Sequence, residues 1–209
     1  MTDPAVPVVL EDDPTPLVLT VGRTLRAGTR DPESRRLMAS LRETVVVKSK
    51  DDPQSVTIRF GQDRVRVGHG IASDTHLVLT VDLADRFAVE SIESADGAGP
   101  DAPLVTKVLR VLRPPLPHWR DAASRFWELT SRDPGMPREL VVVCEEEELI
   151  LGGGLPRYVL SGGAEKLARV LSGTDVFLDE VYTGSLAVRG TMTQLSVMAG
   201  ASLKVRFHA

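Results

Sequence analysis

Hydrophobic positions near the C-terminus follow two different periods, one on each side of Gly190. In the segment 184–190, Leu186 and Val188 alternate with small or polar neighbours, which is typical of a strand with one apolar face. Directly after it, apolar side chains fall three and four positions apart, which predicts an amphipathic helix. That helical stripe consists of Met192, Leu195, Met198 and Ala199. The strand face and the helix stripe are expected to meet, either as an ordinary core or as the wall of a ligand cavity.

Similar patterns occur twice along the chain. Residues 56–70 align without a gap on residues 140–154, with coincident apolar positions and coincident glycines. Residues 76–80 likewise match 157–161, and a helix-like run follows each of these matches. The two helix-like runs cover 84–89 and 164–170. The matches predict an internal duplication in which each unit consists of a hairpin, a strand and a helix, and chance similarity between short apolar strands is the alternative.

Two connections are too short for anything but hairpins. The stretches 61–64 and 145–148 separate consecutive predicted strands, whereas a parallel crossover needs about a dozen residues or more. The strands on either side are therefore predicted to be antiparallel neighbours. With the helix-like runs, this pattern predicts an α/β fold of the α+β type, in which helices cover one face of a mostly antiparallel sheet.

A candidate helix precedes each predicted hairpin. The first, 31–43, begins with an acidic N-cap at Asp31 and a proline at the first helical position, and a strand is expected to follow at 44–48. The second, 118–130, carries a broad apolar face. That face consists of Trp119, Ala122, Ala123, Phe126, Trp127 and Leu129. Between the units, the spacing at 104–112 suits a helix while its valines suit a strand, and we favour the helix.

The 209 residues are enough for two domains of about 100 residues each. Four prolines and an acidic run in 1–16 predict a disordered tail. The first unit is expected at 17–100. A linker is expected at 101–117, where stiff proline-rich sequence leads into the second unit at 118–209.

Composition and charge exclude several classes of protein. Hydrophobic residues make up 42% of the chain, but no run approaches the roughly 18 apolar residues of a membrane helix, so stable membrane insertion is not expected. The formal net charge of -4 argues against a nucleic-acid partner. The single cysteine, Cys144, excludes an intrachain disulfide and is flanked by valines, which predicts a buried strand position. With no signal-peptide pattern at the start, a cytoplasmic location is expected.

Motifs for catalysis or cofactor binding are missing from the sequence. The stretch Gly152–Gly154 lacks the Lys and Ser/Thr of a phosphate-binding loop, and 161–163 lacks the frame of a nucleophile elbow. Histidines are scattered without the spacing of metal ligands. They are His69, His76, His118 and His208. The sequence therefore predicts a protein that is not an enzyme and that uses no cofactor and no metal.

The order of glycines and apolar residues in the second unit points to a family. Gly173 and Asp175 begin a helical stretch that ends at a glycine, and a strand of the form G-x-L-x-V-x-G then leads into the last helix. The strand positions are Gly184, Leu186, Val188 and Gly190. From about Trp119 to the end, the chain resembles the sterol carrier protein 2 domain. The first unit resembles this family only over about 31–90 and lacks a copy of the 184–190 strand.

The resemblance implies a five-stranded, mostly antiparallel sheet covered by helices, with an apolar tunnel for sterols, fatty acids or acyl chains. Each buried methylene of such a ligand is worth about 0.8 kcal/mol, so binding needs no catalytic group. The side chains expected to line this cavity are Phe126, Trp127, Leu167, Leu171, Phe177, Leu178, Val181, Leu186, Val188, Met192, Leu195 and Met198. The first unit, without the 184–190 strand, is expected to be incomplete.

The sequence thus leads to a hypothesis of non-catalytic binding or transfer of a lipid-like hydrophobic ligand by the second unit. The alternative is a protein-interaction or regulatory subunit whose core is filled by its own side chains. Such a subunit can also be an accessory to an enzyme of lipid metabolism. The short strand at 186–188 is expected at a sheet edge that a second copy can cover, which would give a homodimer.

Overall fold

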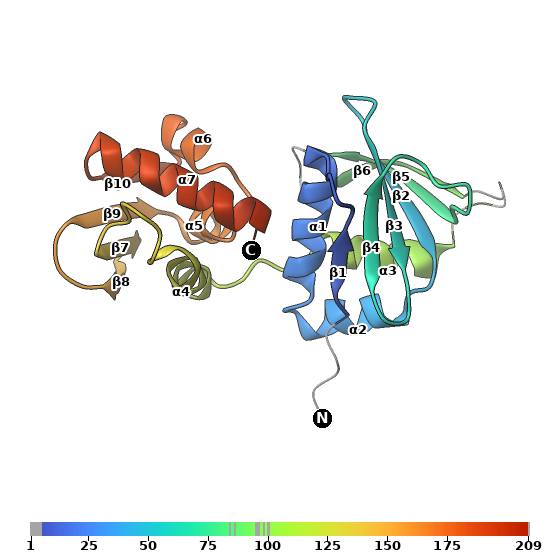
Figure 1. Cartoon of the computed structure of the whole chain (residues 1–209), viewed down its shortest axis with the longest axis horizontal. Helices are drawn as coiled ribbons and strands as arrows, with labels where there is room; N and C mark the ends of the chain where they lie inside the picture. Colours follow the sequence, from blue (N-terminus) through green and yellow to red (C-terminus); the bar gives the residue numbers. More distant parts are fainter. Residues whose placement is uncertain are drawn as a thin grey trace. The chain divides into compact units, whose positions relative to one another are not determined.

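The computed structural model of the chain describes residues 6–83, 85, 87–94, 97, 99 and 101–208, without the side chain of His208. It divides into two compact units, Met1–Pro115 and Leu116–Ala209. Over the described residues the chain forms a mixed α+β structure with two mixed sheets and seven helices (Figure 1). Each unit has a hydrophobic core of its own.

The first unit is built on a six-stranded sheet. Its strands are β1 (Val8–Leu10), β2 (Thr44–Ser49), β3 (Ser55–Phe60), β4 (Val65–His69), β5 (Leu77–Asp82) and β6 (Ala88–Ser94), in the spatial order β1-β4-β3-β2-β5-β6. β2 is antiparallel to β3 and parallel to β5, and β1 joins the edge as a parallel neighbour of β4. β3 and β4 are antiparallel, which confirms the first predicted hairpin.

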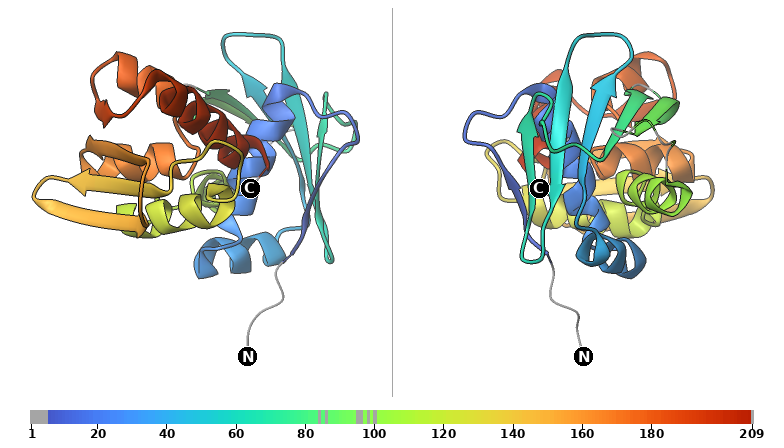
Figure 2. Two further views of the ribbon diagram at one scale, coloured as in Figure 1. Left: turned by 60° about the vertical axis from the view of Figure 1, so that its left-hand side comes forward. Right: turned by 90° about the vertical axis from the view of Figure 1, so that its right-hand side faces the viewer.

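Helices α1 (Pro16–Gly28), α2 (Pro32–Ser40) and α3 (Ala102–Leu112) contribute to the core on one face of this sheet (Figure 2). The start of α2 follows from its sequence, because Asp31 accepts a hydrogen bond from the backbone N–H of Ser34 at 2.8 Å and Pro32 occupies the first helical position. Strand residues two apart, such as Val45 and Val47, point into the same core and are fully buried. α3 confirms the helix favoured for 104–112.

The second unit is built on a four-stranded sheet. Its strands are β7 (Glu139–Cys144), β8 (Glu147–Gly152), β9 (Arg157–Gly162) and β10 (Leu186–Arg189), in the spatial order β10-β9-β7-β8. β7 is antiparallel to β8 and parallel to β9, while β10 is antiparallel to β9 and lies at the edge. The second predicted hairpin and the predicted edge position of β10 are therefore confirmed. Cys144 is buried at the end of β7, as predicted.

The helices of the second unit are α4 (Trp119–Thr130), α5 (Ala164–Leu171), α6 (Phe177–Tyr182) and α7 (Met192–His208) (Figure 1). α4, α5 and α7 pack against one another over one face of the sheet, where alternate strand residues such as Leu140, Val142 and Leu160 join their core. On the opposite face of the sheet, Ile150 is exposed. Among the described residues, no helix is long and apolar enough to cross a membrane.

The strand pairings match the strands of the two units differently from the sequence alignment. The series β3-β2-β5-β6 has antiparallel, parallel and antiparallel neighbours in turn, and so has the series β8-β7-β9-β10. β2 therefore corresponds to β7, whereas the alignment of 56–70 with 140–154 places β3 against β7. β6 also occupies the position of β10, so the first unit does have a strand there. Short valine-rich strands resemble one another in sequence, and only their partners distinguish them.

Residues 8–10 correct the prediction of a disordered tail over 1–16. They form β1 beside β4, and Val6 is buried in the core of the first unit, because apolar side chains at alternate positions can cover the edge of the sheet. α1 begins at Pro16, capped by the Thr15 side chain. Residues 1–5 lie outside the described part of the chain.

The helix predicted at 84–89 is wrong where the structure describes it. Ala88 begins β6, which pairs with β5 through a register shift, after a turn in which Phe87 has a φ of 60°. Residues 84 and 86 lie outside the described residues. The free edge of β5 offers a row of hydrogen-bonding groups to the segment that follows it, and this pairing overrides the helical spacing of a few apolar residues.

The predicted linker, 101–117, largely consists of α3. Val105, Val108 and Val111 recur three apart and lie in the core of the first unit, so this helix belongs to that unit and not to a spacer. The two compact units divide after Pro115.

Candidate functional site

The segment from Gly184 to Met198 contains a strand and a helix that share one core, as the sequence predicts. β10 pairs with β9 so that Leu186 is buried and Val188 half-buried, while Ala187 and Arg189 are exposed. Met198 of α7 lies fully inside the same core, and Leu195 packs against it. The strand and the helix thus close one end of the interior of the second unit.

The side chains predicted to line a cavity lie at three depths. One group is buried in the core of the second unit: Phe126, Leu167, Leu171, Phe177, Leu186 and Met198. A second group is partly buried and packs against it: Trp127, Leu178, Val181, Val188 and Leu195. The structure therefore brings these residues together around one apolar interior, and Met192 is the exception.

Met192 is 78% exposed, which corrects its place in the predicted lining. α7 begins at Met192, and its buried positions are Gln194, Met198, Ala201, Ser202 and Val205. At about 100° per residue, Met192 lies roughly 140° away from the centre of this face. The three-residue spacing between Met192 and Leu195 predicts a common apolar stripe, but the buried face of α7 is centred on the side of Gln194 and Val205, away from Met192.

A polar side chain that the sequence pattern did not single out lies within this apolar core. Tyr158, on β9, is fully buried and belongs to the same core as Phe126 and Leu186. Its Oη is shielded from solvent and forms no hydrogen bond with any described group. Burial alone raises the pKa of this phenol to about 12. The alternation of Tyr158 and Leu160 on one strand face was the available signal for its position.

Gly190 lies over the ring of Tyr158. A β-carbon at position 190 would stand 2.3 Å from Cδ2 and 2.6 Å from Cε2 of that ring, so only glycine permits this approach. Beside it, the Gln194 Oε1 accepts a hydrogen bond from the backbone N–H of Thr191, and the Gln194 Nε2 donates to the carbonyl oxygen of Arg157. Thr191 Oγ1 in turn accepts from the Gln194 backbone N–H, which completes a capping box at the start of α7.

An ion pair fixes the turn between α5 and α6, which contains Gly173 and Asp175 of the sequence pattern described above. Arg169 donates from Nε and Nη2 to the two carboxylate oxygens of Asp175, at 2.6 and 2.7 Å. Burial is the largest single influence on the pKa of Asp175 and tends to raise it, but the hydrogen bonds from Arg169 and the positive charges of Arg169, Lys166 and Arg206 together lower it. Arg206 of α7 donates to the carbonyl oxygens of Gly173 and Thr174. This end of the interior is therefore held by charged groups that already have partners.

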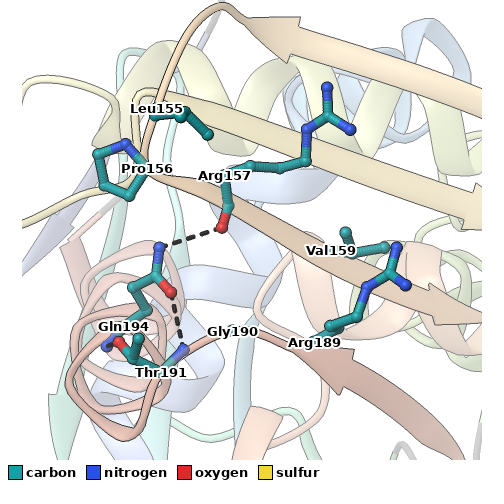
Figure 3. A pocket seen from close by; sticks show the side chains of 8 residues that line it. All are labelled: Leu155, Pro156, Arg157, Val159, Arg189, Gly190, Thr191 and Gln194. Atoms are coloured by element: carbon teal, nitrogen blue, oxygen red, sulfur yellow. Dashed lines mark hydrogen bonds between the residues drawn. The ribbon is translucent and has the colours of Figure 1, made fainter.

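An open pocket of about 430 Å³ lies where β9 and β10 meet the start of α7 (Figure 3). Its lining consists of Leu155, Pro156, Arg157, Val159, Arg189, Gly190, Thr191 and Gln194. The side chains predicted to line a cavity do not contribute to it. The capping box of Thr191 and Gln194 and the alternation of strand residues 157 and 159 were the sequence signals for this surface.

The two arginines of the pocket differ in their partners. Arg157 forms an ion pair with Glu139, whose side chain is nearly buried. Arg189 is exposed and has no ion-pair partner among the described residues. The pocket therefore presents one uncompensated positive charge beside the apolar side chains of Leu155 and Val159 (Figure 3).

Among the histidine, cysteine and acidic side chains of the described residues, no group of three or more is arranged so that it could hold a metal ion. Cys144 is free, and burial raises the pKa of its thiol, which keeps it protonated and weakly nucleophilic.

No protein-family model matches this sequence, and no curated protein matches it either. A solved structure described as "UbiJ-SCP2 Ubiquinone synthesis protein" is similar to 49% of this chain and to 94% of its own, with a TM-score of 0.34 and 17% sequence identity. Similarity at this level does not assign the chain to a family or a function.

Proposed function

We propose that the second unit binds a lipid-like hydrophobic ligand, such as a sterol, a fatty acid or an acyl chain, in its apolar interior. The binding is non-catalytic, so the protein carries or presents the ligand unchanged. The ligand would lie beneath the Gly184–Met198 segment, among the buried and half-buried side chains of β10, α4, α5, α6 and α7.

The observation that carries this proposal is the unpartnered hydroxyl of Tyr158 inside an apolar core. Leaving a buried hydroxyl without a hydrogen bond costs about 1–3 kcal/mol, and such groups in native proteins usually have a partner in protein, water or ligand. A molecule with one polar end and a long apolar body would give Tyr158 its hydrogen bond and fill space among apolar side chains. An apolar core with one such group suits an amphiphile better than a polar metabolite.

The ligand would enter the interior through the edge of the sheet at β10. β10 has only four residues, and among the described strands it pairs with β9 alone. Met198 and Leu195 on α7 face the same interior, and the unbranched methionine side chain adapts to differently shaped ligands. Movement of a short edge strand would disturb few backbone hydrogen bonds, which favours entry here over entry through the centre of the sheet.

The first test is to extract lipids from protein purified without added ligand, identify them by mass spectrometry, and titrate the protein with fluorescent fatty acid and sterol analogues. Bound lipid or saturable binding is expected. An empty protein that binds neither analogue would end the proposal.

Two tryptophan substitutions on α7 place the site. Leu195→Trp enlarges a half-buried side chain that packs on the interior, and Met192→Trp enlarges an exposed one on the same helix. We expect Leu195→Trp to weaken lipid binding with little change in Tm, and Met192→Trp to leave both unchanged. A core filled by its own side chains would instead lose about 1–3 kcal/mol of stability in Leu195→Trp.

A second function, interaction with a protein partner, is favoured by the pocket around Arg189. The occupant that suits it is a partner segment with an acidic residue next to an apolar one, because Arg189 lacks an ion-pair partner among the described residues and Leu155 is 78% exposed. Titration with acidic-apolar and basic-apolar peptides tests this. Arg189→Glu should abolish binding of the acidic peptide, and Arg132→Glu, at another exposed arginine of this unit, should not.

A further inference from the structure

We infer that Tyr158 is the polar anchor of the ligand, and that the ligand end which reaches it is neutral: an alcohol, ketone, ester or amide, and not a carboxylate. The inference rests on the proposed ligand binding in the second unit. It adds the chemical class of the ligand and the residue that selects it.

Tyr158 can offer one O–H donor and an acceptor oxygen to a ligand. With a pKa raised to about 12, the phenol keeps its proton at neutral pH and acts as a neutral donor. No described group competes for Oη. A ligand carbonyl would accept its hydrogen bond, and a ligand hydroxyl could both accept and donate. Either gives the buried Oη a partner without bringing a charge into the core.

A carboxylate at the same place would have no counter-charge. Apart from Tyr158, the buried polar side chains among the described residues of the second unit are Thr130, Glu139, Gln194 and Ser202. None of them is basic, and Glu139 is acidic and already paired with Arg157. An ionised group moved from water into an apolar interior needs a charged partner or loses its charge, because its desolvation is otherwise uncompensated. An ionised fatty acid is therefore disfavoured as the species bound at Tyr158.

The cations that come closest to burial in this unit are committed elsewhere. Arg169 holds Asp175 through two hydrogen bonds, and Arg206 donates to the carbonyl oxygens of Gly173 and Thr174. The Gln194 amide beside the Tyr158 ring is also committed, since its oxygen and nitrogen both have partners. Recruiting any of these groups to a ligand carboxylate would break an existing interaction, which further favours a neutral ligand end.

Probes with one chain and different ends test the inference. Hexadecan-1-ol, hexadecanoate and hexadecane share the apolar chain, and their competition with a fluorescent lipid bound to the full-length protein gives relative affinities at pH 8. We expect hexadecanol to bind at least ten-fold more tightly than hexadecanoate, and hexadecanoate to gain affinity as the pH is lowered and the acid becomes neutral. Hexadecanoate binding as tightly as hexadecanol at pH 8 would overturn the inference and leave lipid binding itself intact.

Tyr158→Phe removes the hydroxyl and keeps the ring beneath Gly190. Hexadecanol should lose about three- to ten-fold in affinity, the value of one hydrogen bond, while hexadecane should bind unchanged. Equal loss for both probes, or loss for neither, would show that Oη does not contact the ligand. If the unaltered protein binds none of the probes and no lipid from the cell, the proposed function fails and this inference fails with it.

The ligand-free stability of Tyr158→Phe gives an independent reading. Since the hydroxyl has no partner in the described structure, the variant should have a urea midpoint at or above that of the unaltered protein. A clear fall in the midpoint would mean that Oη has a protein or water hydrogen-bond partner in the ligand-free protein. The hydroxyl would then not depend on a ligand for its hydrogen bond, which contradicts the inference.

Discussion

Gly190 and Tyr158 are in direct van der Waals contact, glycine backbone against aromatic ring, at the point where β10 passes into α7. A β-carbon on Gly190 would come 2.3 Å from Cδ2 of the ring and 2.8 Å from the Gln194 Oε1. The ring of Tyr158 therefore allows only glycine at position 190, directly after β10. The glycine that closes the G-x-L-x-V-x-G pattern thus has a steric reason to be there, in the packing of Tyr158.

Replacing Gly190 with alanine should destabilise the second unit by about 1–3 kcal/mol, because the added methyl group must push a buried ring and a hydrogen-bonded amide aside. The measurement is urea denaturation at neutral pH. Gly200→Ala is the matched control on α7, where an added β-carbon meets nothing within 4 Å. We expect it to be neutral or to stabilise the helix by about 0.5–1 kcal/mol. Equal stability of Gly190→Ala and Gly200→Ala would contradict the contact.

Gln194→Glu separates the two roles of the Gln194 amide. The carboxylate can still accept from the Thr191 N–H, but it cannot donate to the Arg157 carbonyl oxygen and repels it. We expect a loss of about 2–3 kcal/mol at pH 7, against about 1 kcal/mol for Thr191→Ala, which removes only the side-chain cap.

The pH dependence of Gln194→Glu provides its control. Protonation of the new carboxyl restores a donor, so its deficit relative to the unaltered protein should shrink as the pH falls from 7 to about 4.5. A deficit that stays constant over this range would mean that the bond to Arg157 contributes nothing to stability.

Local pattern was enough to predict most elements of the second unit. The alternation at 186–188 and the spacing in 164–171 each depend on neighbours in sequence, and the structure has β10 and α5 there. β6 could not be predicted in this way. Its strand state depends on the open edge of β5, which comes from the arrangement of the sheet and not from the residues 88–94 themselves.

The candidate site was predictable only in part, for a related reason. Apolar residues such as Phe126 and Leu186 enter the core because of their own hydrophobicity, which a sequence displays. Tyr158 stands out because its hydroxyl has no hydrogen-bond partner among the described residues. The residues around that hydroxyl come from distant segments of the chain, so the sequence pattern does not display this. Periodicity also fails at the first turn of a helix, as at Met192, where the contact face is set by the packing of later turns.

The corrected face of α7 predicts different effects for its two methionines. Met198→Ala should cost about 2–5 kcal/mol, because it removes a fully buried side chain, whereas Met192→Ala should change stability by less than about 0.5 kcal/mol. Thermal or urea unfolding of both variants measures the difference. Similar losses in the two would return Met192 to the interior and contradict the placement of the helix.

The pair Arg169–Asp175 predicts how stability depends on acid. In the folded protein the pKa of Asp175 is lowered from its ordinary value of 3.8. Its contribution to stability is therefore complete above about pH 4 and is lost as the pH falls through the lower folded-state pKa. Asp175→Asn should cost about 2–3 kcal/mol at pH 7, since both partners are largely shielded from water. Urea titrations from pH 7 to pH 2.5 should show this difference shrinking below pH 4.

Glu165→Gln is the control. Glu165 also pairs with Arg169, at 3.8 Å, but its side chain is 72% exposed, so its loss should change stability by less than about 0.5 kcal/mol. A difference between Asp175→Asn and the unaltered protein that is as large at pH 2.5 as at pH 7 would show that the contribution of Asp175 does not come from its charge.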